Sequence, residues 1–318
     1  MDVSEEELLA AIQKVLSGSG PEVVVGVGDD AAVLIPGTGQ LVITTDAMVE
    51  GSHFARSTTS ARDLGYKAIV VNVSDIAAMG ASPRYAVCAL TLSDEVDAAW
   101  AMEMLGGMRE AADEYALWLV GGNLASGRDV TVTVTVTGEV ASGRAVLRSG
   151  AHLGDRILVT GSLGGSAAGL RVGNSKKRWS DEERDAIARH FRPVARVGEG
   201  QALARHGATA MIDISDGFAL DLSRVCAASE VGARVSGFEA VRHPAATAEE
   251  ALSGGEDYEL LAAMPADGVE AATAELRESF GVALTDVGEF VDRPGMTMVA
   301  PDGTERSLEP RGWDHFAD

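Results

Sequence analysis

The sequence predicts an α/β or α+β fold made of two domains. The chain has 318 residues, 46% of them hydrophobic, which is ample for a large core and favours two domains over one. Segments with helical periodicity alternate with short apolar segments typical of strands along the whole chain. The join is predicted near 145–154, after a series of glycines, and we divide the chain into 1–148 and 149–318.

The N-terminal half is predicted to begin with an amphipathic helix. Ser4 and Glu7 form a capping box ahead of apolar residues at helical spacing. Threonine and valine alternate strictly over 131–137, which is the period of a strand with one face in water. Between these elements the pattern predicts strands at about 22–27 and 40–45, a helix over 61–79, a strand near 84–92 and a helix near 95–116.

The C-terminal half is predicted to start with a new strand at 155–160. This strand leads into a glycine-rich segment, 161–169, and then a helix. The same periodicities predict the remaining elements. They are helices near 181–191, 198–206, 217–229 and 267–279, and strands at 210–214, near 256–264 and near 282–290.

The composition excludes two classes of partner. Acidic residues outnumber basic ones 48 to 26, a formal net charge of −22, whereas nucleic acids and anionic membranes attract clustered lysine and arginine. The N-terminus carries no signal-peptide pattern, and no apolar run reaches the length of a membrane span. Cys88 and Cys226 lie in apolar segments, as expected of core residues in a reducing compartment. We therefore expect a cytoplasmic protein.

Five aspartates lie inside apolar or glycine-rich segments, where an ionised carboxylate is costly unless a partner compensates its charge. They are Asp30, Asp46, Asp75, Asp213 and Asp216. No lysine or arginine occurs within any of these segments. Mg²⁺ is the natural alternative, because it prefers hard oxygen ligands and bridges protein carboxylates to substrate phosphates. The sequence therefore predicts an enzyme that acts on phosphates with the help of metal ions.

Two of these aspartates lie on predicted elements of the N-terminal half. Asp75 belongs to an apolar stripe of the 61–79 helix. The stripe has 4-3-4 spacing and consists of Leu64, Ala68, Val71 and Asp75. The alternative is a carboxylate satisfied by backbone donors or by a distant arginine. Asp46 ends a strand after Thr44 and Thr45, whose hydroxyls could add ligands, but an aspartate there is also typical of a helix N-cap or a turn.

In the C-terminal half, Asp213 and Asp216 flank Ser215, where a predicted strand meets a predicted helix. Here the alternative to a metal ligand is an N-cap role for Ser215 or Asp216.

The usual phosphate-binding motifs do not occur in the sequence. Gly26-Val-Gly-Asp-Asp30 lacks the third glycine of a dinucleotide fingerprint, and its two acids stand where a pyrophosphate would lie. There is neither a P-loop nor a protein-kinase signature. Gly121-Gly122-Asn123 is predicted as a flexible turn whose backbone N–H groups can approach a phosphate. Phosphoryl transfer would therefore depend on a site of acids and metal ions.

Taken together, these segments resemble the thiamine-monophosphate kinase family. Its superfamily also includes aminoimidazole ribonucleotide synthetase, selenophosphate synthetase and the hydrogenase-maturation dehydratase. The matching segments occur in order across nearly the whole chain, which makes the resemblance highly specific. They are 26–32, 45–46 with 51–54, 63–68, 72–81, 148–151, 212–217, 253–260 and 312–316.

The resemblance implies transfer of the γ-phosphoryl group of ATP to thiamine monophosphate, which gives thiamine diphosphate and ADP. It implies an aminoimidazole ribonucleotide synthetase-like fold. Its N-terminal domain, with a mixed sheet, binds ATP and Mg²⁺ and pairs across a homodimer, and its C-terminal α/β domain completes the substrate site. The five aspartates would then form one shared metal site with three ligands from the N-terminal half and two from the C-terminal half.

The resemblance also assigns roles to individual residues. Several Mg²⁺ ions would be held by Asp30, Thr44, Thr45, Asp46, Asp75, Asn123, Asp213 and Asp216. ATP would lie along Gly122, Asn123, Arg148 and Ser215. Thiamine monophosphate would contact His53, Glu256 and Trp313, the last by stacking on a ring. No protein nucleophile is expected, because the acceptor is already an ionised phosphate oxygen.

One position departs from the family pattern in a way that affects the metal site. The family usually has Gly-Gly-Asp where this chain has Gly121-Gly122-Asn123, so one negative charge is missing from the predicted metal site. Thr44 in place of the usual serine keeps the hydroxyl. Two alternatives to the kinase remain open: a sister ATP-using enzyme of the superfamily, and a non-catalytic module that binds nucleotide and Mg²⁺.

Overall fold

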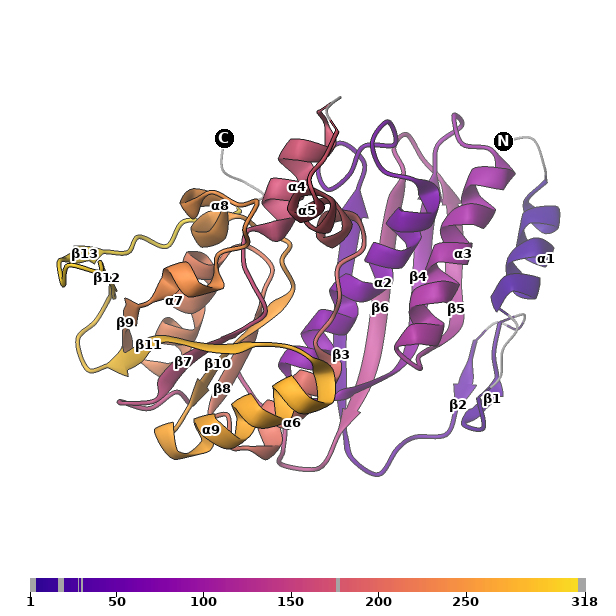
Figure 1. Cartoon of the computed structure of the whole chain (residues 1–318). Helices are drawn as coiled ribbons and strands as arrows, with labels where there is room; N and C mark the ends of the chain where they lie inside the picture. The colour runs from indigo at the N-terminus through magenta and orange to yellow at the C-terminus, as the bar shows by residue number, and fades with distance from the viewer. Residues whose placement is uncertain (1–3, 17–19, 28, 30, 176–177, 314–318) are drawn as a thin grey trace. The chain divides into compact units, whose positions relative to one another are not determined.

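The computed structural model describes residues 4–16, 20–27, 29, 31–175 and 178–313. The chain divides into two compact units. Unit 1 comprises 1–76 and 82–143, and unit 2 comprises 77–81 and 144–318. Each unit contains its own sheet and helices (Figure 1). Within the described residues, no helix is both long enough and apolar enough to cross a membrane.

Unit 1 contains a four-stranded mixed sheet in the order β3-β6-β4-β5. The β4–β5 pair is parallel and the other two pairs are antiparallel. These strands are β3 (Gln40–Val49), β6 (Thr131–Val140), β4 (Ser82–Leu92) and β5 (Trp118–Ser126). The strands predicted near 84–92 and 131–137 are confirmed, and the one predicted at 40–45 extends further.

Two helices, α2 (Ala61–Ala78) and α3 (Ala98–Glu114), cover one face of this sheet (Figure 1). Their backbones approach so closely that a Cβ atom at Gly65 would lie 1.8 Å from the carbonyl oxygen of Met104. A Cβ atom at Gly107 would lie equally close to the carbonyl oxygen of Arg62. The valines of β6 are buried and its threonines are half-buried, as the period-2 pattern predicts.

The N-terminal segment adds a helix and a hairpin to unit 1. The helix α1 (Glu5–Leu16) begins at the predicted capping box, where Ser4 N–H donates to Glu7 Oε2 at 2.9 Å. The two-stranded sheet pairs β1 (Val23–Val25) with β2 (Val33–Leu34). The sequence pattern did not predict β2, which has only two residues.

Unit 2 contains a seven-stranded sheet in the order β13-β12-β9-β11-β7-β10-β8. The β12–β9 pair is parallel, and all other neighbours in this sheet are antiparallel. The strands are β7 (Arg156–Thr160), β8 (Ala210–Ile214), β9 (Gly232–Ser236), β10 (Glu259–Met264), β11 (Leu284–Val291), β12 (Met296–Val299) and β13 (Glu305–Ser307). The strands β9, β12 and β13 were not predicted.

The helices of unit 2 largely match the prediction. They are α4 (Gly165–Gly173), α5 (Asp181–Phe191), α6 (Val197–Arg205), α7 (Phe218–Ser229), α8 (Ala248–Ser253) and α9 (Ala266–Glu275), with a 3₁₀ turn at Phe238–Val241 and a π-helical turn at Leu276–Phe280. The sequence pattern did not predict α8. The α/β class of the prediction is confirmed in both units.

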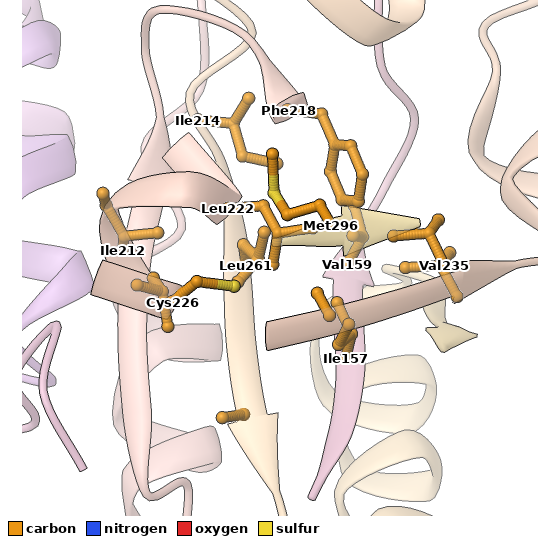
Figure 2. Packing of buried hydrophobic residues seen from close by; sticks show 14 of the residues in the cluster. Ile157, Val159, Ile212, Ile214, Phe218, Leu222, Cys226, Val235, Leu261 and Met296 are labelled. Carbon is orange, nitrogen blue, oxygen red and sulfur yellow. The ribbon is translucent and has the colours of Figure 1, made fainter. Parts of the chain in front are cut away.

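The main core of unit 2 lies between its sheet and α7 (Figure 2). Ile212 and Ile214 of β8 pack in it against Phe218 and Leu222 of α7. Because side chains alternate along a strand, the intervening Asp213 must point to the opposite face of the sheet. This alternation places the Asp213 carboxylate on the face of the sheet that also carries Met211 and Leu260.

Candidate functional site

Asp75 of unit 1 lies on the helix α2 beside the strand β3. Leu64, Ala68 and Val71 of its stripe are buried, whereas Asp75 itself is half-buried. The hydroxyl of Thr44 donates to Asp75 Oδ2 at 2.5 Å. The structure therefore brings together two of the predicted metal ligands, an anionic oxygen and a hydroxyl oxygen from different elements.

The register of β3 separates the three adjacent ligand candidates between the two faces of the sheet. Thr44 pairs with the buried Val136 of β6, and Asp46 pairs with Val134, so both side chains lie on the face that the helices cover. Thr45 lies on the opposite face, where its hydroxyl donates to Val134 O at 3.1 Å and accepts from Thr135 Oγ1 at 3.0 Å.

Asp46 is exposed, so the predicted cost of burial does not arise at this residue. The physical reason is its place on β3, which is an edge strand of the four-stranded sheet. The alternatives of an N-cap or a turn are wrong as well, because Asp46 lies within β3 rather than at its end.

The predicted turn at 121–123 is wrong, since all three residues lie inside the edge strand β5. Gly122 pairs with Cys88 of β4 in a parallel register that shifts just before Gly121. A Cβ atom at Gly122 would lie 2.1 Å from the carbonyl oxygen of Cys88, which only glycine avoids. Asn123 is exposed and pairs with Ala89, so it shares the face of Thr45 rather than that of Asp46.

His53 is fixed by a tight turn that follows β3. Val49 N–H donates to its Nδ1 atom at 3.1 Å, and the His53 N–H donates back to Val49 O at 2.9 Å. The turn includes Gly51 at φ +88, a conformation that favours glycine. Since Nδ1 accepts a hydrogen bond, the neutral ring carries its proton on Nε2, and that atom is a hydrogen-bond donor.

Asp30, the remaining ligand candidate of the N-terminal half, lies outside the described residues. Among the residues that the structure does describe, no three acidic, histidine or cysteine side chains converge into a metal-binding group. The donors present at Thr44 and Asp75 are nonetheless hard oxygens of a hydroxyl and a carboxylate, which suit Mg²⁺. Because Mg²⁺ typically takes one or two carboxylates plus substrate phosphates, this donor set fits the metal.

In unit 2, Asp213 is the most deeply buried of the described aspartate candidates, with 3% exposure. It lies on β8 opposite Leu260 of β10. Asp216 follows the end of the same strand and is less buried.

Asp216 has an arginine partner that the sequence pattern did not reveal. Arg224 Nη2 lies 2.7 Å from Asp216 Oδ2, and the same guanidinium donates to Asp221 Oδ1 at 2.5 Å. Asp221 is fully buried, and its Oδ2 atom accepts from the N–H groups of Asp216 and Gly217. The N-cap of α7 is Gly217, so the alternative N-cap role for Ser215 or Asp216 is wrong. Asp221 and Arg224 are three residues apart, a helical spacing that could have predicted the ion pair between these two residues.

Four of the predicted site residues of unit 2 meet through backbone hydrogen bonds. Glu256 N–H donates to Ser215 O at 2.7 Å, and Trp313 N–H donates to Asp216 O at 2.9 Å. The indole of Trp313 is 51% exposed and is therefore accessible to a ligand. The loop after β8 thus contacts both the Glu256 segment and the Trp313 segment.

Arg148 lies at the other end of β8. The carbonyl of its neighbour Leu147 accepts from Met211 N–H at 2.9 Å, near the start of the strand, whereas Ser215 follows its end. The Arg148 side chain is exposed.

A buried polar cluster borders the Glu256 segment. His190 Nδ1 lies 3.4 Å from Glu256 Oε2 and 3.0 Å from Ser166 Oγ. The adjacent Asp257 accepts from the N–H groups of Gly164 and Ser166, and burial raises its pKa to about 7. None of His190, Ser166 and Asp257 was predicted as a functional residue, because the three are distant in sequence and their spacing matches no known motif.

Comparison with known proteins gives consistent matches over the full chain. The model of the family AIR synthase related protein, N-terminal domain, matches residues 28–140, and that of its C-terminal domain matches 153–300. The thiamine-monophosphate kinase of Escherichia coli (strain K12) is 40% identical over 330 residues, covering 100% of this chain and 99% of the relative.

Two solved structures are similar to this one. The thiamine-monophosphate kinase from Stenotrophomonas maltophilia K279a has a TM-score of 0.82 and 33% identity, over 95% of this chain and 98% of that one. A structure described as AaThiL complexed with AMPPCP and TMP has a TM-score of 0.74 and 32% identity, over 99% of both chains.

Proposed function

This chain belongs to the thiamine-monophosphate kinase family, and from that premise we propose how it carries out the ATP-dependent phosphorylation of thiamine monophosphate to thiamine diphosphate. The observation that carries the proposal is the half-buried carboxylate of Asp75, which interrupts an apolar helix face and accepts a hydrogen bond from Thr44. A carboxylate in that position favours a charged ligand over a purely structural role.

Oxygen atoms of both units are proposed to bind Mg²⁺. The proposed ligands are Asp30, Thr44, Thr45, Asp46, Asp75, Asn123, Asp213 and Asp216. When bound, Mg²⁺ neutralises the negative charge on the transferred phosphoryl group and its neighbours. The side chains of Thr45 and Asn123 lie on the face of the sheet opposite to Thr44 and Asp46. For these two residues the proposal requires the backbone carbonyl or a rearranged side chain, since the Thr45 hydroxyl hydrogen-bonds to β6.

The proposed ATP contacts combine exposed backbone groups of unit 1 with a cationic side chain. Gly122 and Asn123 are exposed on the edge strand β5, where backbone groups without a bulky side chain can approach phosphates. Arg148 supplies an exposed guanidinium that suits phosphate oxygens, and Ser215 supplies a hydroxyl.

The proposed thiamine monophosphate contacts are His53, Glu256 and Trp313. The half-exposed indole of Trp313 offers a stacking surface for an aromatic ring. The carboxylate of Glu256 complements an organic cation, and the Nε2–H of His53 can donate to a phosphate oxygen. The protein then holds two phosphates in line, and no side chain acts as a nucleophile.

We propose that the enzyme is a homodimer that pairs through the open face of the four-stranded sheet. This face carries the exposed apolar residues Leu41 (72% exposed), Ile43 (64%) and Val87 (40%) beside the threonines of β6. A second copy of the same face would bury this apolar surface. Light scattering tests the proposal: a dimer supports it, and a monomer at micromolar concentration contradicts it.

The direct test of the function is a coupled assay for ADP release with thiamine monophosphate, with and without Mg²⁺. We expect turnover that requires both the substrate and the metal. ATP binding without turnover would instead identify a non-catalytic nucleotide-binding module, which the loss of one charge at Asn123 favours as the second candidate.

A further inference from the structure

The segment that carries Glu256 has an unusual backbone that its surroundings hold in place. Glu256 has φ +66 and Tyr258 has φ +52, left-handed values that residues with a side chain rarely adopt. Glu256 N–H donates to Ser215 O at 2.7 Å, and Tyr258 N–H donates to Ile214 O at 2.9 Å. Strain of this kind persists only where the neighbouring structure enforces it, and it is concentrated at functional sites.

Consecutive side chains of this segment meet the helices α4 and α5. Asp257 Oδ2 accepts from Gly164 N–H at 2.6 Å, and its Oδ1 accepts from Ser166 N–H at 3.1 Å, at the first turn of α4. The carboxylate of Glu256 faces His190 of α5 instead, with its Oε2 atom 3.4 Å from the ring Nδ1. Ser166 connects the two contacts, because its hydroxyl lies 3.0 Å from the same Nδ1 atom.

The carboxylate of Glu256 and the hydroxyl of Ser166 determine which ring nitrogen of His190 carries the proton. An ionised carboxylate only accepts hydrogen bonds, whereas a serine hydroxyl either donates or accepts. A lone pair on Nδ1 would therefore face the carboxylate oxygen unfavourably, and Nδ1–H is the favoured form. His190 is 7% exposed and packs edge-on against Phe191 with the ring centroids 4.8 Å apart. The donor is consequently held in one direction.

From this geometry we propose that His190 is a positioning residue for substrate binding. Its Nδ1–H is shared between the hydroxyl oxygen of Ser166, 3.0 Å away, and the carboxylate of Glu256, 3.4 Å away, and so holds that carboxylate in the direction that contacts the organic cation of thiamine monophosphate. This inference rests on the proposed role of Glu256 in the kinase. It predicts that losing His190 weakens binding of thiamine monophosphate and leaves ATP binding unaffected.

The experiment compares three variants of His190 and its neighbours by steady-state kinetics and by calorimetric binding of thiamine monophosphate. His190→Leu removes the donor, and we expect KM and Kd for thiamine monophosphate to rise about ten- to a hundredfold, with KM for ATP unchanged within about twofold. His190→Asn retains an N–H near the Nδ1 position and should restore binding to within about threefold of the wild type. Ser166→Ala should cause a smaller rise, because it loosens the ring without removing the donor.

A coupling measurement separates positioning from general structural damage. Glu256→Gln should raise KM by itself, and adding His190→Leu to it should cause no further rise, because the group to be positioned is already altered. His243→Asn is the matched control, since it changes another buried histidine, whose Nε2 atom lies 2.9 Å from Asp185 Oδ2. We expect the control to leave KM for thiamine monophosphate unchanged.

Two kinds of failure are distinguishable. A wild-type enzyme without ADP release on adding thiamine monophosphate would contradict the proposed function. An active wild type with unchanged KM and Kd in His190→Leu would overturn the positioning role. If His190→Leu does not fold, unchanged KM and Kd for thiamine monophosphate in folded Ser166→Ala overturn it, because that variant removes the hydroxyl that orients the ring.

Discussion

Asp75 of unit 1 and Asp216 of unit 2 belong to the same sequence pattern but have different neighbours. Asp75 accepts a hydrogen bond from the neutral hydroxyl of Thr44, whereas Asp216 forms an ion pair with Arg224. Arg224 also pairs with the buried Asp221, so it joins two carboxylates of α7 and the preceding loop. An aspartate in an apolar segment therefore identifies a charge that needs compensation, but not the kind of partner that compensates it.

The largest effect is expected at Asp75. Asp75→Asn should lower kcat for ADP release about a thousandfold, because it removes an anionic oxygen from the proposed metal site. Its melting temperature should stay equal or rise, since a half-buried charge is removed. Survival of activity in a folded variant would show that Asp75 is structural.

Asp257 has a third kind of partner, because its carboxyl group accepts hydrogen bonds from the backbone N–H groups at the start of α4. Burial raises its folded-state pKa to about 7, above an unfolded value of about 4. Between these values the folded state binds more protons than the unfolded one, so this group makes the protein less stable as pH rises from about 4 to 7. The free energy of unfolding of Asp257→Asn, relative to that of the wild type, should rise by about 2–4 kcal/mol as the pH increases from about 4 to about 7. Urea unfolding at several pH values measures the difference in the free energy of unfolding between the variant and the wild type. A difference that does not change with pH would contradict the raised pKa of Asp257.

Replacing Arg224 tests how much the ion pairs of unit 2 contribute to stability. Arg224→Met should lower the free energy of unfolding by about 1–3 kcal/mol, because Asp221 stays buried without its cation. Arg234→Met is a suitable control, since Arg234 pairs with the partly exposed Glu305 at the sheet edge. We expect Arg234→Met to lower the free energy of unfolding by less than about 1 kcal/mol. Equal losses in chemical denaturation would contradict the special role of the Arg224 pair.

The smallest effect concerns the missing charge in unit 1. Asn123→Asp should lower the Mg²⁺ concentration needed for half-maximal activity by a few-fold, about 1 kcal/mol, because it restores a carboxylate on β5. The control is Asn123→Ala, which removes the amide oxygen and should raise that concentration. An Mg²⁺ titration with unchanged midpoints in both variants would exclude Asn123 from the metal site.

The sequence predicted the fold class and most elements because their periodicity reflects burial. The alternation in β6 and the apolar part of the α2 stripe are both confirmed by the exposure of their side chains. The strands β12 and β13 were missed, since three or four residues give no clear period. The strand β9 was missed because its apolar residues are only Ala233 and Val235, whereas β7 and β8, which have the same length, are more continuously apolar. The double glycine at 121–122 suggested a turn, but the structure requires Gly122 for its close approach to Cys88 within a sheet.

The candidate site was predicted residue by residue, but its internal contacts were not. The ion pair of Arg224 with Asp216 depends on the turn at Gly217, which has φ +118, and the sequence pattern does not specify that geometry. The contact of His190 with Glu256 joins the helix α5 to the loop between α8 and β10, which are far apart along the chain. Neighbours of this kind follow from tertiary packing rather than from spacing in the sequence.

Calorimetric titration of Mg²⁺ into the enzyme with a non-hydrolysable ATP analogue tests the role of Asp75 most directly. We expect the wild type to bind Mg²⁺ and folded Asp75→Asn to lose a binding event or weaken it at least about tenfold. Arg234→Met, which removes an arginine that pairs with Glu305 rather than with a proposed ligand, should retain every binding event. Identical Mg²⁺ binding by the wild type and Asp75→Asn would contradict the proposal that this aspartate holds metal.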